Sequence, residues 1–216
     1  FLGSALHAAS PVLPDFPLRQ IPGDFGLADG PAWEGWALTV ADPKSQAAPR
    51  YVVAKDEWLP GAKDRRISAT FFNHGHLYLS DNGNGQILRR GYDNAYEVLH
   101  SEDLEADPTR RPNDLVVDRS GGIYFTLTKP GQVVYVAPDG GSTVVADDAE
   151  TANGLILSPD ESILYVAEFV PKRIVSYPVL PDGSLGDRSV FATMDDGHPD
   201  LRGAYGMSID RAGNVY

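Results

Sequence analysis

A strand–turn–strand unit that recurs along the chain is the feature that most restricts its fold. Residues 113–126 read NDLVVDRSGGIYFT, residues 153–167 read NGLILSPDESILYVA, and residues 205–216 read YGMSIDRAGNVY. A shorter copy, FFNHGHLYLSD, occupies residues 71–81. Short apolar runs that are bounded by Gly, Pro, Asn and Asp are typical of antiparallel strands. The chain is therefore expected to be an all-β protein.

The spacing of the copies predicts how the strands are arranged. Repeats of about 40 to 50 residues with several strands in each are typical of β-propeller blades. Each blade is a small twisted sheet that buries its faces only by packing against its neighbours. Repeat starts near positions 29, 71, 113, 153 and 205 predict a six-bladed β-propeller, of which this chain covers about five blades.

The rest of the chain is assigned around this repeat. Residues 1–20 contain small and apolar residues and then prolines, and we interpret them as an N-terminal extension or a signal-peptide remnant. Residues 21–216 form the expected propeller domain, which is incomplete at its C-terminal end. Residues 42–70 are polar and irregular and are expected to be an insertion. The signal-peptide interpretation predicts a secreted or periplasmic protein, and without it the protein is expected to be cytoplasmic.

Composition excludes several classes of function. The chain has 18 basic and 30 acidic side chains, a formal net charge of −12, whereas nucleic-acid-binding proteins carry a basic surface. There is no apolar run long enough for a transmembrane helix. There is no cysteine, which excludes disulfides, thiolate catalysis and cysteine-based zinc sites. A soluble globular protein with a small-molecule partner is the remaining expectation, and its oligomeric state is not predicted.

Polar residues at the start of the inner strands are the candidate functional residues. The innermost strand of each blade lines the central channel, so Asn113 and Asn153, which hold the same repeat position, should converge on one axial site. Asp29 and Tyr205 are the residues at the corresponding starts of other repeats. Carboxylate and amide oxygens are the ligands that calcium prefers. The alternative is that these residues only cap turns by binding the backbone.

The motifs ADGPAWEG, RPNDLVVDRSGGIYFT, NGLILSPDESILYVAE and YGMSIDRAGNVY, in this order, resemble the senescence marker protein/gluconolactonase/luciferin-regenerating-enzyme family. The resemblance covers roughly residues 20–216. It implies a six-bladed β-propeller with a divalent metal in the central tunnel, usually calcium, with zinc and magnesium as alternatives. It also implies a small-molecule partner, a sugar lactone or similar ester, which the protein would hydrolyse.

The resemblance assigns roles to individual residues. Asn113 and Asn153 match two metal-binding asparagines of the family. Arg111 matches an arginine that contacts the substrate. Asp29 stands where the family usually has glutamate, and it keeps the carboxylate that would bind the metal and take part in catalysis.

The fourth position departs from the family's pattern. The usual motif is D-G-M, but here Tyr205 takes the place of the aspartate in AYGMSID. A neutral phenol is a poor calcium ligand, and its unperturbed pKa is near 10. Tyr205 is therefore expected to contact the substrate or a water molecule. Asp200, in HPDLRG, is the candidate for the missing catalytic carboxylate, and His198 is a further candidate base.

Other functions remain open at this stage. A related propeller could hydrolyse organophosphates or aryl esters at the same site. The replacement of aspartate by Tyr205 is also compatible with a non-catalytic metal- or sugar-binding propeller. A purely structural or protein-binding propeller would hold no cation at the entrance of its tunnel.

Overall fold

The computed structural model describes residues 19–194 and 203–216. The expected N-terminal extension therefore lies almost wholly outside the described residues, as do His198 and Asp200. Within these ranges, sixteen strands form four antiparallel sheets of four strands each. Within the described ranges there is no helix that is long and apolar enough to cross a membrane.

Each sheet is a meander whose strands pair in chain order from the inner to the outer edge. The first sheet contains β1 (Asp29–Trp33), β2 (Ala37–Ala41), β3 (Ala47–Val52) and β4 (Glu57–Lys63). The second contains β5 (Ile67–Asn73), β6 (His76–Asp81), β7 (Gln86–Arg90) and β8 (Tyr96–Ser101). The third contains β9 (Pro112–Val117), β10 (Ile123–Leu127), β11 (Gln132–Val136) and β12 (Ser142–Ala146). The fourth contains β13 (Ala152–Leu157), β14 (Ile163–Glu168), β15 (Arg173–Pro178) and β16 (Ser189–Thr193).

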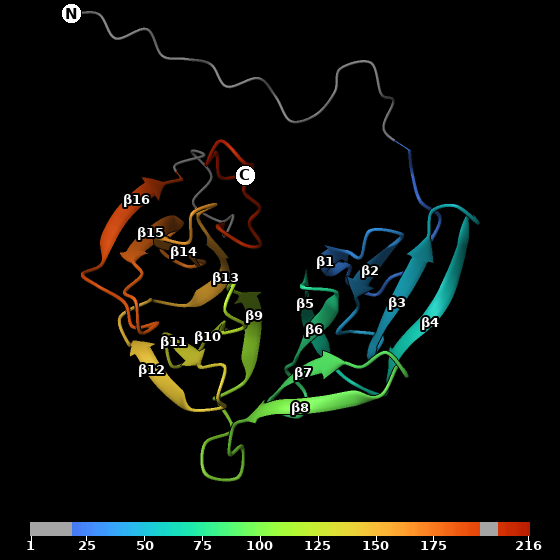
Figure 1. Cartoon of the computed structure of the whole chain (residues 1–216), viewed down its shortest axis with the longest axis horizontal. Coiled ribbons are helices and arrows are strands. Elements are labelled where there is room, and N and C mark those ends of the chain that lie inside the picture. The colour runs from blue at the N-terminus through green and yellow to red at the C-terminus, as the bar shows by residue number, and fades with distance from the viewer. Residues whose placement is uncertain (1–18, 195–202) are drawn as a thin grey trace, which may run out of the picture.

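The four sheets are the blades of a β-propeller (Figure 1). Their inner strands follow one another around an axis, because β1 contacts β5, β5 contacts β9, and β9 contacts β13. Residues 203–216 continue this order. The Gly154 N–H on β13 donates a hydrogen bond to the Tyr205 carbonyl, and Ile209 pairs with Val215 in an isolated bridge. The described residues thus form four complete blades and the beginning of a fifth, as the repeat predicted.

The prediction of an irregular insertion over residues 42–70 is wrong. These residues form β3 and β4, the two outer strands of the first blade, and the start of β5. Outer strands expose much of their surface, so their sequences need no continuous apolar run. In β3 the buried side chains are Ala48, Tyr51 and Val52, and half-exposed residues lie between them.

The hydrophobic core lies between neighbouring blades. Ile67 and Leu79 are fully buried between the first and second blades, and Phe125 is fully buried between the second and third. Leu164 and Val166 are fully buried between the third and fourth. Because each blade buries its faces against the next, the order of the blades also fixes the positions of the inner strands around the axis.

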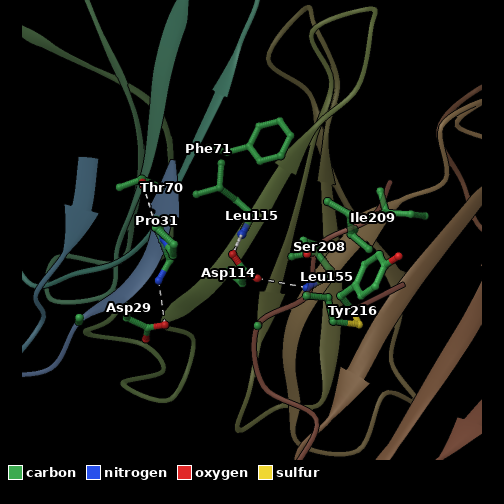
Figure 2. Close-up of a pocket in the computed structure, with 15 residues that line it drawn as sticks. Asp29, Pro31, Thr70, Phe71, Asp114, Leu115, Leu155, Ser208, Ile209 and Tyr216 are labelled. Carbon is green, nitrogen blue, oxygen red and sulfur yellow. Dashed lines mark hydrogen bonds between the residues drawn. The ribbon is translucent and has the colours of Figure 1, made fainter. Parts of the chain in front are cut away.

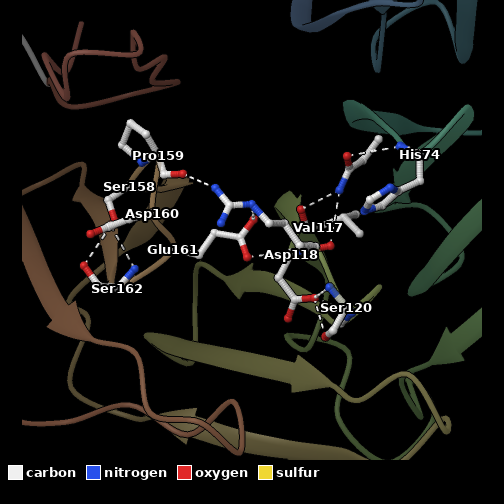
Figure 3. A network of polar contacts seen from close by, with 12 residues as sticks. His74, Val117, Asp118, Ser120, Ser158, Pro159, Asp160, Glu161 and Ser162 are labelled. Atoms are coloured by element: carbon white, nitrogen blue, oxygen red, sulfur yellow. Dashed lines mark hydrogen bonds and ion pairs between the residues drawn. The ribbon is translucent and has the colours of Figure 1, made fainter.

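Polar side chains join the blades at the C-terminal ends of the inner strands. Asn73, which ends β5, donates from its amide to the Val117 carbonyl at a distance of 3.0 Å. Arg119, in the turn after β9, pairs with Glu161 in the turn after β13. Figure 3 shows these turns of the third and fourth blades side by side. Together with the apolar core, these contacts hold the inner strands in register.

All four inner strands have an irregular register at their first residues. The pairing shifts between Asp29 and Ala32 in β1, and between Ala152 and Leu155 in β13. Corresponding shifts occur where β5 pairs with β6 and where β9 pairs with β10. A bulge re-aims the side chains next to it, so the simple alternation of inward and outward residues fails at this end of every blade.

Candidate active site

The inner strands surround a cavity of about 550 Å³ (Figure 2). Its walls come from β1, β5, β9, β13 and the segment that begins the fifth blade. The lining residues are Ala28, Asp29, Gly30, Pro31, Thr70, Phe71, Asp114, Leu115, Leu155, Ile156, Gly206, Met207, Ser208, Ile209 and Tyr216. Most of this surface is apolar, and its two carboxylates belong to Asp29 and Asp114. The cavity is referred to below as the tunnel.

Asp29 lies at the first residue of β1, as the sequence predicted. Its Oδ1 accepts a hydrogen bond from the Gly30 N–H at 2.9 Å. Gly30 has a φ of +38°, and a Cβ at this position would lie 2.5 Å from the Cα of Ala69 on β5. Glycine therefore allows β1 to approach β5 closely and brings Asp29 to the tunnel. Burial raises the pKa of Asp29 above its usual value, and the hydrogen bond from Gly30 opposes this shift.

Asp114 is a candidate site residue on the tunnel wall that was not predicted from the sequence. Its Oδ1 accepts from the Leu115 N–H at 2.8 Å, and its Oδ2 accepts from the Leu155 N–H on β13 at 3.2 Å. The carboxylate thus bridges two inner strands. Burial raises the pKa of Asp114 to about 7, the two backbone hydrogen bonds oppose that shift, and the negative charge of Asp29 adds to it.

A signal for Asp114 was present in the repeat. The copies that begin NDLVV and NGLIL differ at their second residue, where one has Asp114 and the other has Gly154. An aspartate in front of an apolar strand either caps a turn or points its carboxylate toward the central axis of the propeller. The prediction of site residues rested on the first residue of each copy, and Asp114 is the second.

Thr126 positions Asp114 and Asn153 relative to each other. Its hydroxyl donates to the Asn153 carbonyl at 2.6 Å and accepts from the Asp114 N–H at 3.2 Å. Thr126 is fully buried, and Asn153 is also buried. The Asn153 side-chain amide makes no hydrogen bond to the residues that the structure describes. Although the residue is buried overall, its amide atoms reach solvent and are free to bind a ligand.

Arg111 and Asn113 line a second cavity, of about 340 Å³, near the start of β9. Arg111 Nη1 donates to the carbonyls of Asn82 and Gly83, at 2.9 and 2.6 Å, and Nε donates to the Pro108 carbonyl at 3.1 Å. The guanidinium is therefore held by loop backbone, and Nη2 makes no hydrogen bond in the described part of the chain. Of the predicted site residues, Asp29 lines the tunnel, and Arg111 and Asn113 line this second cavity. Asn153 and Tyr205 line neither of them, and the adjacent residues Asn113 and Asp114 line different cavities.

Tyr205 lies near both tunnel carboxylates. Partial burial raises the pKa of its phenol, and the negative charges of Asp29 and Asp114 raise it further. The side chain is 46% exposed and contacts Phe169 edge-on, with ring centroids 5.6 Å apart. The phenol is therefore neutral at neutral pH and can donate a hydrogen bond.

The donor set fits a hard divalent cation. In residues 19–194 and 203–216 there is no group of three or more His, Asp or Glu side chains placed to hold a metal. Two carboxylates, Asp29 and Asp114, and the unpartnered Asn153 amide do lie on the inner strands. Oxygen ligands of this kind suit calcium, whereas zinc favours nitrogen and sulfur ligands. A cation would also offset the cost of burying two negative charges near each other.

Several known proteins are similar to this chain in sequence and fold. The family model described as SMP-30/Gluconolactonase/LRE-like region matches residues 27–216. A gluconolactonase from Zymomonas mobilis is 24% identical over 93% of this chain and 66% of its own length. The solved structure of a gluconolactonase from Xanthomonas campestris is 27% identical, with a TM-score of 0.72 over 87% of this chain and 68% of that chain.

A calcium-binding regucalcin from Agrobacterium tumefaciens shares the fold at 18% identity, with a TM-score of 0.71 over 88% of this chain and 66% of that chain. The chain thus spans about two thirds of the length of each of these three proteins.

Proposed function

Because the chain belongs to the SMP-30/gluconolactonase/LRE-like family, we propose that it hydrolyses a lactone or a similar carboxylic ester at the tunnel. The observation that carries this proposal is the pair of carboxylates, Asp29 and Asp114, on the tunnel wall. Two similar proteins, from Zymomonas mobilis and Xanthomonas campestris, are named gluconolactonases, which supports a sugar lactone as the substrate class.

Lactone hydrolysis requires a base for the attacking water and a donor for the oxygen that leaves. The water oxygen forms a bond to the carbonyl carbon and gives its proton to a carboxylate, Asp114 or Asp29. The ring C–O bond then breaks, and the ring oxygen takes a proton to become a hydroxyl. Tyr205 lies close enough to both carboxylates to donate a hydrogen bond to a substrate oxygen there.

Arg111 and Asn113 are the proposed substrate-holding residues beside the tunnel. The backbone carbonyls that bind Arg111 fix the orientation of its guanidinium plane. Nη2 is then free to bind an oxygen of the lactone ring or of its hydroxyl groups. Because this contact is made in substrate and transition state alike, its removal should raise KM more than it lowers kcat.

Asp29, Asp114 and Asn153 would hold a divalent cation, for which calcium is the best match to an all-oxygen ligand set. When bound there, the cation would polarise the lactone carbonyl and stabilise the developing negative charge on its oxygen. The calcium-binding protein with the same fold is consistent with this choice. Asn113, which the sequence also predicts as a metal ligand, lines the neighbouring cavity with Arg111 and is not part of this proposed ligand set.

The experiment is hydrolysis of glucono-δ-lactone, followed by acid release in weakly buffered solution with calcium or EDTA. We expect calcium-dependent turnover that Asp114→Asn lowers by about 10²- to 10⁴-fold, the usual contribution of a positioned base. Glu105→Gln removes one exposed carboxylate from a loop and serves as the matched control. Turnover by Asp114→Asn equal to that of Glu105→Gln would refute the role of the tunnel carboxylate.

A non-catalytic sugar- or cation-binding propeller is the second candidate, because Tyr205 stands where the family has aspartate. Calcium binding without hydrolysis of any lactone, aryl ester or organophosphate would favour this candidate. Hydrolysis of paraoxon or phenyl acetate in preference to gluconolactone would favour the related ester hydrolases instead.

A further inference from the structure

A third cavity, which the proposed reaction does not use, lies between the first two blades. Its volume is about 450 Å³. β1 begins in the tunnel at Asp29, and the turn that follows β1 at the other end carries Trp36. Arg50 from β3 and Tyr92 from the turn between β7 and β8 line the cavity together with Trp36. The cavity is therefore at the opposite end of the blades from the tunnel carboxylates.

Arg50 has no anionic partner in this cavity. Its Nε is buried and has no hydrogen-bond acceptor, and its guanidinium makes no ion pair with a described residue. The guanidinium lies over the face of the Trp36 ring, 5.7 Å from the centroid, and its positive charge also lies near the Tyr96 phenol. The Glu34 carboxylate lines the same cavity, but Arg90 and Thr39 already bind it. The two Nη atoms also have no acceptor among the described residues and, unlike Nε, are not buried, so an anion in the cavity can bind them.

The same repeat position in the next blade shows what Arg50 lacks. Arg50 is the fourth residue of β3, and Arg89 is the fourth residue of β7. Arg89 lies opposite Glu97 on β8 and forms an ion pair with it at 2.7 Å. Arg50 lies opposite Leu59 on β4, which is apolar. The equivalent arginine is thus neutralised within its own blade, and Arg50 is not.

The cavities between the other blades are smaller, and the residues equivalent to Arg50 have polar partners within the protein. The corresponding cavities between blades two and three, and between blades three and four, have volumes of about 210 and 230 Å³. In the third blade the fourth residue of the third strand is Tyr135, whose hydroxyl donates to Asp118 at 3.1 Å. The first junction alone of these three combines an unpaired arginine with roughly twice the volume.

Two aromatic rings flank the unpaired charge. Trp36 is 49% exposed and Tyr92 is 88% exposed, and both line the cavity. Rings of this kind bury the flat face of an aromatic or pyranose ring. The Glu34–Arg90 pair contributes no net charge, so the cavity offers one positive charge and suits a monoanion. A guanidinium recognises a carboxylate through two parallel hydrogen bonds.

We propose that the cavity between the first two blades binds a small molecule in which a carboxylate is attached to a ring. Arg50 takes the carboxylate, and Trp36 and Tyr92 lie against the ring. Sugar acids and aromatic acids share this chemistry. The site is separate from the tunnel, so it stands whether or not the protein hydrolyses lactones.

The test is a titration of the full chain, observed through the Nε–H resonances of arginine side chains in ¹H–¹⁵N spectra. The probes are glucuronate, phenylacetate and acetate. We expect the Arg50 resonance to shift saturably with one of the ring acids, at a Kd of about 1 mM or tighter. Acetate, which has no ring, should bind about tenfold more weakly or less. Whichever ring acid binds more tightly identifies the source of the ligand.

Three variants check the assignment. Arg50→Met should abolish the binding, and Arg89→Met, at the equivalent repeat position, should leave it unchanged. Arg50→Lys keeps the charge without the planar fork and should weaken binding if Arg50→Met does not fold. Failure of both ring acids to shift Arg50, or equal binding by Arg50→Met, would overturn the proposal. Equal affinity for acetate would overturn the ring contact with Trp36 and Tyr92.

Discussion

Asp114 illustrates how a single side chain acquires its chemistry from its surroundings. It is a carboxylate held between β9 and β13, and its pKa is raised to about 7 mainly by burial. Because its pKa in the unfolded chain is near 4, the folded state binds the proton more tightly. The stability that this group contributes is therefore fully present below pH 4 and is lost as the pH rises through 7.

We predict that Asp114→Asn flattens the dependence of the free energy of unfolding on pH between pH 4 and 8. A pKa shift of this size corresponds to at most about 4 kcal/mol over that range. The measurement is urea unfolding in EDTA at several pH values. The slope is the decisive quantity, because asparagine also loses one of the two hydrogen bonds that Asp114 accepts. An unchanged slope would contradict the raised pKa.

Tyr205 is the residue at which the family's pattern and this sequence differ. We predict that Tyr205→Asp raises the calcium affinity about tenfold or more, because it adds an anionic oxygen beside Asp29 and Asp114. Without calcium the same variant should unfold at lower temperature, because three carboxylates then repel one another. Calorimetric titration and thermal unfolding measure both effects. Val144→Asp, on the exposed face of β12, is the control and should leave the affinity unchanged.

At the scale of strands and turns, one turn geometry recurs in all four blades. The residue before the third strand has a positive φ each time: Gln46 (54°), Gly85 (69°), Gly131 (70°) and Lys172 (54°). Glycine takes this conformation without strain, whereas a side chain does not. The backbone of the repeat is thus more regular than its sequence at this position.

We predict that Gln46→Gly stabilises the protein by about 0.5 to 1 kcal/mol, because it relieves the strained conformation of an exposed residue. Gly85→Gln should destabilise it, since a Cβ at this position lies 2.8 Å from the Leu104 side chain. Both effects are measured by chemical unfolding. If both substitutions changed the free energy of unfolding in the same direction, a shared turn geometry would be contradicted.

Thr126 links two inner strands, because its hydroxyl forms hydrogen bonds with the backbone of both β9 and β13. We predict that Thr126→Val lowers calcium affinity and turnover together by about tenfold, since the Asp114 N–H and the Asn153 carbonyl each lose a partner. Thr126→Ser keeps the hydroxyl and should restore both. If Thr126→Val changed only the stability of the fold and not the calcium affinity, the link between the two site residues would be refuted.

At the scale of the whole molecule, the tunnel exists only when blades are packed around the axis. Asp29 comes from the first blade, Asp114 from the third and Asn153 from the fourth. A ligand held by these residues ties three blades together, and it can do so only in the folded state. Its binding free energy therefore adds to the stability of the whole domain.

We predict that calcium raises the thermal unfolding temperature cooperatively, in one transition, and that EDTA reverses the effect. At a free concentration about 100 times Kd, the stabilisation should be about 2.7 kcal/mol. Asp29→Asn should remove most of this gain, although it lies in a different blade from Asp114 and Asn153. Stabilisation of one blade alone, seen as a second transition, would contradict a site shared between blades.

The repeat can be read from the sequence alone, and the fold follows from the repeat. Period, turn residues and short apolar runs are local properties, and they predicted that Asp29, Asn113 and Asn153 begin or lie in inner strands, as they do in β1, β9 and β13. The outer strands β3 and β4 escaped prediction because half-exposed strands carry little apolar signal.

Which side chains reach the tunnel depends on how the strands pair and pack, and it could not be predicted from the sequence. The shifted register at the start of each inner strand breaks the alternation from which the direction of a side chain is read. Asp114 therefore lines the tunnel, and Asn113 faces the neighbouring cavity with Arg111. The pKa of Asp114 was equally beyond the sequence, because burial and the charge of Asp29 arise from residues that the fold alone brings together.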